Sequence, residues 1–142
     1  MKKKIIIVSG YFNPLHKGHI EYFHLAKKNA DKLFVIVNND KQRELKGSKE
    51  FMKQEERLFI LKELKIIDEV FLSIDYDNTV IKSISKIHGL YQENYEILFG
   101  NGGDQNNQKI PEKSICEKLK IKLIDGLGNK IQSSSWLINK QK

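Results

Sequence analysis

The sequence predicts an α/β fold in which a five-stranded parallel sheet is flanked by helices, within one domain that covers residues 1–142. Short apolar runs, rich in β-branched residues, alternate with longer segments that have helical periodicity. The most unusual polar and glycine-containing segments follow the apolar runs, at the end of each expected strand. A chain of 142 residues without a visible internal repeat is most simply one domain with its own core.

The first half of the chain is expected to contain three buried strands and two helices. The strands are predicted at 5–9, 32–38 and 69–74, and the helices at 18–29 and 53–65. The second helix carries Leu58, Leu61 and Leu64 at helical spacing, which gives it one apolar face. Residues 39–52 are polar and are predicted to form a loop.

The second half is expected to continue the same alternation. Asp77 or Asn78 can cap a helix that runs to about residue 88, and Pro111 suits the first turn of a helix that ends near 120. Further strands are predicted at 96–99 and 121–124, and residues 133–135 would cap a short final helix. Because the carboxyl ends of parallel strands meet at one edge of a sheet, the polar segments that follow them are expected to form one site. Those segments are 10–19, 38–48, 75–78 and 100–106.

The net charge of +7 is compatible with an anionic partner or with a solvated lysine-rich surface. No basic block interleaves with aromatic residues, which argues against nucleic-acid binding. Arg43 and Arg57 are the two arginines among 25 basic residues. An arginine in such a chain can serve where a lysine cannot, as in bidentate phosphate contact, although chance can also leave two arginines.

The sequence offers no sign of export or of a membrane span. The apolar run after the first lysines is too short for a signal peptide, and no stretch approaches the roughly 18 apolar residues that cross a bilayer. Cys116 is the single cysteine, so a disulfide framework is excluded, and its helical context favours a buried thiol over a nucleophile. These observations favour a cytoplasmic protein.

The stretch IIIVSGYFNPLHKGH over residues 5–19 is the strongest functional signal. It places a strand, a tight turn and two histidines, His16 and His19, at the start of a helix. Backbone N–H groups at a helix N-terminus attract anions, and the imidazoles can add hydrogen bonds or positive charge there. Zinc is an alternative with His24 as a third ligand, but no carboxylate or cysteine stands beside it. Neither a dinucleotide G-x-G-x-x-G fingerprint nor a Walker A motif is present.

The segment SGYFNPLHKGH resembles the signature of the HxGH nucleotidyltransferase superfamily, whose members include cytidylyltransferases and adenylyltransferases on a Rossmann-like fold. Class I tRNA synthetases share the motif, but this chain is short and lacks their lysine-containing second signature. Three further segments resemble the family in the same order along the chain. They are KGSKEFMKQEERLFILKEL with Lys46 and Arg57, GNGGD after the fourth strand, and KIQSSSWLI.

The resemblance implies a site in which His16, His19 and Lys46 are catalytic and Mg²⁺ bridges the phosphates with few protein ligands. The residues that it implies for nucleotide and phosphate binding are Gly10, Tyr11, Phe12, Asn13, Gly18, Arg57, Asn101, Gly102, Asp104, Gln132, Ser133, Ser134 and Ser135. Without that resemblance, Lys46 and Arg57 can be surface cations and the serines a loop or cap. Asp75 and Asp77 can be metal ligands or, more simply, helix caps.

The small domain and the compact serine motif lead us to expect a cytidylyltransferase that transfers CMP from CTP to a small phosphorylated alcohol or sugar. An ATP-dependent adenylyltransferase is the alternative, because Asn13-Pro14 stands where the cytidylyltransferases often have Asp and Leu. A non-catalytic nucleotide-binding module is a third hypothesis. Other departures from the cytidylyltransferase pattern are Asn101-Gly102-Gly103 in place of Gly-Asp-Asp, and Lys130 where an arginine is usual. Family habit suggests a homodimer.

Overall fold

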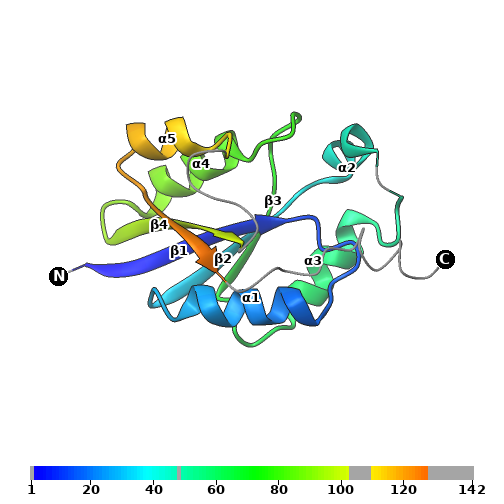
Figure 1. The fold of residues 1–142 in the computed structure, drawn as a ribbon, viewed down its shortest axis with the longest axis horizontal. Coiled ribbons are helices and arrows are strands. Elements are labelled where there is room, and N and C mark those ends of the chain that lie inside the picture. Colours follow the sequence, from blue (N-terminus) through cyan, green and yellow to red (C-terminus); the bar gives the residue numbers. More distant parts are fainter. Residues whose placement is uncertain (1, 48, 103–109, 128–142) are drawn as a thin grey trace.

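The computed structural model describes residues 2–47, 49–102 and 110–127, which contain a five-stranded, all-parallel sheet in the order β3-β2-β1-β4-β5 (Figure 1). Its strands are β1 (Lys3–Gly10), β2 (Lys32–Val37), β3 (Glu69–Leu72), β4 (Tyr95–Gly102) and β5 (Lys122–Leu127). The predicted fold class is therefore confirmed, with every expected strand within a few residues of its predicted bounds.

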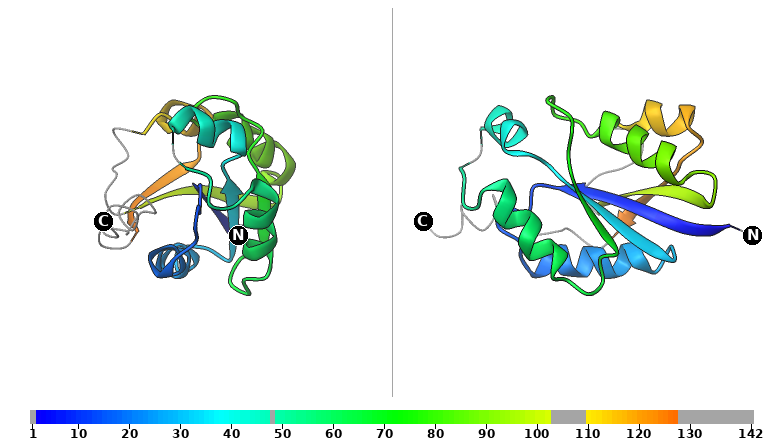
Figure 2. Two further views of the ribbon diagram at one scale, coloured as in Figure 1. Left: turned by 90° about the vertical axis from the view of Figure 1, so that its right-hand side faces the viewer. Right: turned by 180° about the vertical axis from the view of Figure 1, so that it is seen from behind.

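Helices cover both faces of the sheet (Figures 1 and 2). One face carries α1 (Lys17–Lys27) and α3 (Gln54–Lys62), and the other carries α4 (Ile81–Tyr91) and α5 (Lys113–Lys118). A fifth helix, α2 (Asp40–Lys46), lies beyond the carboxyl end of β2. No helix among the described ranges is both long enough and apolar enough to traverse a bilayer.

The core has two layers, one on each side of the sheet. In β1, Ile6 and Val8 pack in the layer under α1 and α3, whereas Ile5 and Ile7 pack in the layer under α4. All four side chains are 0% exposed, and burying each contributes roughly 1.5–3 kcal/mol. Burial on both faces explains why the strands read as continuous apolar runs without alternation.

The predicted loop at 39–52 is wrong in part, because it contains α2. Asn39 caps this helix by accepting the Gln42 N–H at 2.9 Å, while the Gln42 side chain returns to the Asn39 backbone. Gly47 ends the helix in the left-handed conformation, with φ at 77°. The cap signal was present in the sequence, but the helix has no apolar stripe to mark it.

The helix expected to begin at residue 77 or 78 begins at Ile81 instead. Asp77 closes a short turn with Thr79, whose N–H lies 2.9 Å from the carboxylate. Asp75 caps α4 by accepting the backbone N–H groups of Lys82 at 2.8 Å and Ser83 at 2.9 Å. Asp75 therefore caps the helix, whereas Asp77 bonds within the turn that precedes α4. The final helix that residues 133–135 are expected to cap lies outside the described residues.

Cys116 is a buried thiol in α5, as predicted, and is 0% exposed. Burial raises the pKa of its thiol to about 12, and the nearby Glu112 carboxyl adds to the effect. A thiol with that pKa is protonated at neutral pH and is a poor nucleophile.

Candidate active site

The site lies where the chain order of the sheet reverses. β1 pairs with β2 on one side and with β4 on the other, so the two halves of the fold diverge from β1. At its carboxyl end Gly10 stands opposite Val37, and the Asn38 N–H donates to the Gly10 carbonyl at 2.9 Å. This reversal brings the turn after β1 beside the segment after β2.

Gly10 and Phe12 give the turn after β1 its shape. A Cβ on Gly10 would lie 2.7 Å from the tip of the Phe12 ring, so this position has no room for a side chain. Phe12 has a φ of 53° and turns its buried ring toward α1. There it meets His19 and Phe23 edge-on, with ring centroids 4.9 and 5.4 Å away. The Phe12 ring therefore packs against His19, and the absence of a side chain at Gly10 leaves room for that ring.

The two histidines are held together at the N-terminus of α1. His16 is the N-cap, and its Nδ1 accepts the Gly18 N–H at 3.1 Å. His19 Nδ1 accepts the backbone N–H of His16 at 3.2 Å, which completes a capping box made of two imidazoles. The rings stack with centroids 3.9 Å apart and an interplanar angle of 29°.

This arrangement keeps both imidazoles neutral. Burial lowers the pKa of His19 to about 3, with the neighbouring His16 adding to the effect, and burial also lowers the pKa of His16. Because each Nδ1 accepts a hydrogen bond, the ring proton of each neutral imidazole is assigned to Nε2. His16 Nε2 is buried and has no hydrogen-bond partner among the described residues. It is a donor without an acceptor, at a helix N-terminus that favours anions.

Lys46 contacts Tyr11 in the segment that follows β1 and carries the histidines, which we call the histidine turn (residues 11–19). Lys46 is the last residue of α2, and its Nζ lies 4.6 Å from the centroid of the Tyr11 ring. The Tyr11 hydroxyl donates to the Gln42 carbonyl at 3.4 Å. Burial raises the pKa of Tyr11, and the charge of Arg57 partly opposes that rise. The structure thus brings one predicted cation to the edge that carries His16.

Asn13 and Arg57 lie at the same edge, but their polar atoms face the protein. The Asn13 side chain bonds to the backbone of residues 49–52, and the Arg57 side chain is 0% exposed. Arg57 Nη1 donates to the carbonyls of Tyr11 and Asn38, each at 2.7 Å, and Nη2 pairs with Asp40 at 2.7 Å. The other arginine, Arg43, lies 3.4 Å from the Glu50 carboxylate through Nη2.

The other side of the edge is formed by the end of β4. Asn101 is buried there and Gly102 is the last residue of the strand. The Tyr22 hydroxyl of α1 donates to the Gly100 carbonyl at 2.9 Å, which ties the histidine-bearing helix to β4. Among the remaining predicted residues, Asp104, Gln132, Ser133, Ser134 and Ser135 lie outside the described part of the chain.

A family model described as cytidylyltransferase-like matches residues 7–124, a span that includes the histidine turn, α2, α3 and the end of β4. The chain belongs to the cytidylyltransferase-like family. The resemblance inferred from the sequence is therefore confirmed at the level of the nucleotidyltransferase superfamily, whose members are transferases.

Curated relatives of this cytidylyltransferase-like chain include proteins named FAD synthase and bifunctional protein HldE. It is 44% identical over 126 residues to FAD synthase from Thermococcus sibiricus, covering 87% of this chain and 78% of that protein. It is 30% identical over 127 residues to the bifunctional protein HldE from Aliarcobacter butzleri, covering 87% of this chain and 25% of that protein. The chain also spans only 58% of the FAD synthase from Picrophilus torridus, at 33% identity.

Solved structures share the fold at lower identity. The lipopolysaccharide core biosynthesis protein from Thermoplasma volcanium has a TM-score of 0.72 and 23% identity, over 90% of this chain and 98% of that one. A putative nicotinate-nucleotide adenylyltransferase from Vibrio parahaemolyticus has a TM-score of 0.65 and 17% identity, over 96% and 79%. At these identities the likeness supports the Rossmann-like fold of the cytidylyltransferase-like domain.

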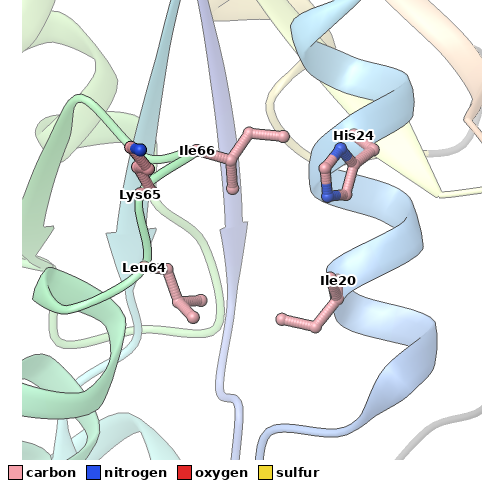
Figure 3. A pocket seen from close by; sticks show the side chains of 5 residues that line it. All are labelled: Ile20, His24, Leu64, Lys65 and Ile66. Atoms are coloured by element: carbon pink, nitrogen blue, oxygen red, sulfur yellow. The ribbon is translucent and has the colours of Figure 1, made fainter.

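The zinc alternative would need at least three protein ligands around one position. The described residues contain no group of three or more histidine, cysteine or acidic side chains placed to hold a metal ion. His24 instead lines a surface hollow, where it and Ile20 face the loop before β3 (Figure 3). That loop contributes Leu64, Lys65 and Ile66.

The sequence did not identify Gln42, whose side chain links the segment after β2 to the turn before α4. Its side chain is 0% exposed, and its Nε2 donates to the carbonyls of Asp77 and Thr79, each at 2.8 Å. Its Oε1 accepts from the Asn38 side chain and the Asn39 backbone. The spacing of Asn39 and Gln42 is that of a capping box, which was the available signal.

Proposed function

We propose that this chain transfers an adenylyl group from ATP to an acceptor that carries a phosphate monoester. The observation that carries the proposal is the stacked pair of neutral imidazoles at the N-terminus of α1, with His16 Nε2 buried and lacking an acceptor among the described residues. A donor of this kind, at the positive end of a helix dipole, suits a phosphate oxygen.

The choice of ATP over CTP is supported by the relatives. FAD consists of FMN joined to AMP through a pyrophosphate, so an enzyme named FAD synthase forms an adenylyl–phosphate bond, and one such protein is 44% identical to this chain. CTP remains the second candidate, because the family model that matches residues 7–124 is described as cytidylyltransferase-like.

The proposed reaction forms one P–O bond and breaks another. An oxygen of the acceptor phosphate attacks the α-phosphorus of ATP, and the bond from that phosphorus to the oxygen bridging the α- and β-phosphates breaks. The products are a pyrophosphate-linked adenylyl compound and free pyrophosphate. Charge accumulates on the equatorial and leaving oxygens, so positioned hydrogen-bond donors and cations supply most of the catalysis.

Three side chains are proposed to stabilise the charge that develops on these phosphate oxygens. His16 and His19 would donate from Nε2 to oxygens of the α-phosphate, and both would do so as neutral groups because their pKa values are lowered. Lys46 would contribute the cation from above Tyr11, at the end of α2. The exposed Lys46 side chain can leave the ring at modest cost when a phosphate competes for it.

Mg²⁺ is proposed to enter with the nucleotide. The described residues hold no group of three or more potential ligands for a resident ion. That suits a cation that keeps most of its ligands from phosphates and water. Bound to the phosphates, Mg²⁺ would neutralise charge on the departing pyrophosphate, and a structural relative from Francisella tularensis was solved with AMP and manganese.

The test is a matrix of the four nucleoside triphosphates with Mg²⁺ against FMN and a panel of phosphorylated sugars and alcohols, read as pyrophosphate release. We expect release with ATP and at least one acceptor, and mass spectrometry of the product identifies that acceptor. Release with CTP alone would replace ATP in the proposal. No release from any pair, with nucleotide binding intact, would favour the non-catalytic module.

A further inference from the structure

Asn13 and Arg57 hold the same residue, Met52, from two sides. Asn13 Oδ1 accepts the Met52 N–H at 2.9 Å and the Phe51 N–H at 3.0 Å, while its Nδ2 donates to the Lys49 carbonyl at 2.6 Å. Arg57 Nε donates to the Met52 carbonyl at 3.2 Å. We call Asn13, Arg57 and the Met52 backbone the Met52 clasp.

The Met52 clasp also fixes the turn after β1. Arg57 Nη1 donates to the Tyr11 carbonyl and to the Asn38 carbonyl, each at 2.7 Å. One guanidinium thus links the turn after β1, the end of β2 and the segment before α3. These three segments are distant in sequence and adjacent only at this edge of the sheet.

The Met52 clasp is linked to α2, the helix that ends at Lys46, by a hydrogen bond from Arg57 to Asp40, the first residue of that helix. Asp40 Oδ1 accepts from Arg57 Nη2 at 2.7 Å. Asp40 and Gln54 also bond reciprocally, because the Asp40 N–H donates to Gln54 Oε1 at 2.9 Å and the Gln54 N–H donates to Asp40 Oδ2 at 3.2 Å. These bonds fix the start of α2, a helix of seven residues whose last residue, Lys46, lies over Tyr11.

We infer that Asn13 and Arg57 are positioning residues, which hold α2 and its Lys46 against the histidine turn, and that neither side chain binds the nucleotide. This inference rests on the proposed function for the role of Lys46. It also replaces the expectation, drawn from the family resemblance, that both residues contact nucleotide or phosphate.

The chemistry of each side chain supports this assignment. Asn13 is 4% exposed and uses its amide as donor and acceptor at once, so an aspartate would set a carboxylate oxygen against the Lys49 carbonyl. The Arg57 side chain is 0% exposed, makes four hydrogen bonds to protein atoms and has its charge balanced by Asp40. A phosphate ligand would instead need N–H groups that face solvent.

The first part of the test needs no substrate. In the ligand-free protein, Asn13→Ala is expected to speed amide hydrogen exchange at Phe51 and Met52 by tenfold or more, and to remove the ring-current shift that Tyr11 imposes on the Lys46 side chain in NMR spectra. Exchange within β1 should not change. The matched control is Asn29→Ala, because Asn29 is exposed and bonds only within the end of α1. Unchanged exchange at Phe51 and Met52 would overturn the inference, whether or not the proposed function holds.

The second part is a double-mutant cycle on the affinity for Mg·ATP, with Lys62→Ala as the control for loss of a lysine. If Asn13 acts through Lys46, adding Asn13→Ala to Lys46→Ala should weaken binding by less than twofold beyond Lys46→Ala alone. An equal loss in both backgrounds would mean that Asn13 contacts ATP and would overturn the inference. If the wild type binds no ATP, the proposed function fails, and the exchange and ring-current measurements still decide whether the Met52 clasp positions Lys46.

Arg57→Lys extends the test to the second residue. A lysine keeps a cation for phosphate but cannot bond to Met52, Tyr11, Asn38 and Asp40 together. Loss of the Lys46 ring-current shift in a folded Arg57→Lys protein would support positioning, whereas an unchanged shift would exclude it for Arg57. If this variant does not fold, the Asn13 variants decide the inference.

Discussion

His19 Nδ1 accepts the backbone N–H of His16 at 3.2 Å, and the two imidazole rings stack 3.9 Å apart. Each ring therefore uses Nδ1 as an acceptor in the helix cap, which leaves Nε2 as its donor. Protonating either ring would break its cap bond and place a charge beside its neighbour. Both imidazoles are therefore expected to be neutral at pH 7.

The lowered pKa values of His16 and His19 predict how the free energy of unfolding depends on pH. The folded pKa of His19 is about 3, below the 6.5 of the unfolded chain, so the unfolded state binds more protons between these values. Stability should thus fall as pH drops from 7 to 5, and the lowered pKa of His16 acts in the same direction. Urea unfolding at several pH values measures this slope, and His19→Asn should reduce it. An equal slope in wild type and His19→Asn would contradict the prediction.

His16→Asn separates catalysis from capping. Asparagine is a favoured N-cap, so it keeps an acceptor for the Gly18 N–H but loses the Nε2 donor. We expect the unfolding free energy to stay within about 0.5 kcal/mol of wild type, while the rate of pyrophosphate release falls about 10²–10³-fold. His24→Asn, on the same helix but outside the site, should leave the rate unchanged. A wild-type rate in His16→Asn would remove His16 from the proposed mechanism.

The proposed reaction should not lose rate as pH rises through 6.5 toward 8. Imidazolium donors would lose their protons in that range, whereas neutral Nε2–H donors keep theirs, and the lowered pKa values place both rings in the neutral form. The pH profile of nucleotidyl transfer measures this directly. A rate that declines along a titration curve centred near 6.5 on the alkaline side would show that a charged histidine is required.

Gly10→Ala should destabilise the fold by about 1–3 kcal/mol, because the new methyl group would lie 2.7 Å from the Phe12 ring. Gly89→Ala is the matched control. It lies inside α4 with open space where the new methyl group would stand, so it should stabilise by about 0.5–1 kcal/mol. Chemical denaturation of both variants checks the contrast. Combining Gly10→Ala with Phe12→Leu should recover part of the loss if the clash is the cause.

Asp40→Asn tests the charge balance of Arg57. The substitution keeps the size of the side chain and removes the negative charge that faces the buried guanidinium, so we expect a loss of about 1–3 kcal/mol in unfolding free energy. Glu21→Gln is the comparison, because the Lys17–Glu21 pair is exposed and should contribute less than about 0.5 kcal/mol. Similar losses in the two variants would mean that Arg57 does not depend on Asp40.

Most of the sheet could be predicted because its strands are buried on both faces, which leaves continuous runs such as Ile5, Ile6 and Ile7. The helix α2 was missed for the opposite reason. Its buried residues are Gln42 and Arg43, both polar, and Gln42 is held by the carbonyls of Asp77 and Thr79. Periodicity of apolar residues cannot report a helix that tertiary hydrogen bonds stabilise.

The histidine pair could be predicted because its members are neighbours in sequence. The contacts of Arg57 could not, since its partners Tyr11 and Asn38 lie 46 and 19 residues away. The sequence showed an arginine in a chain of lysines and suggested planar recognition of a phosphate. In the structure the guanidinium of Arg57 bonds to backbone carbonyls. The residue type alone does not tell an arginine that binds phosphate from one that binds carbonyls.

Cys116 makes the protein suitable for labelling at a chosen surface position. It is the one cysteine in the sequence, it is 0% exposed, and its raised pKa keeps it unreactive toward thiol reagents in the folded state. Leu45 lies on α2 and is 60% exposed. In the variant Leu45→Cys a fluorescent thiol reagent would therefore label residue 45 and leave Cys116 unmodified. The wild-type background therefore allows site-specific dyes to follow α2 as nucleotide is added, without first removing a native thiol.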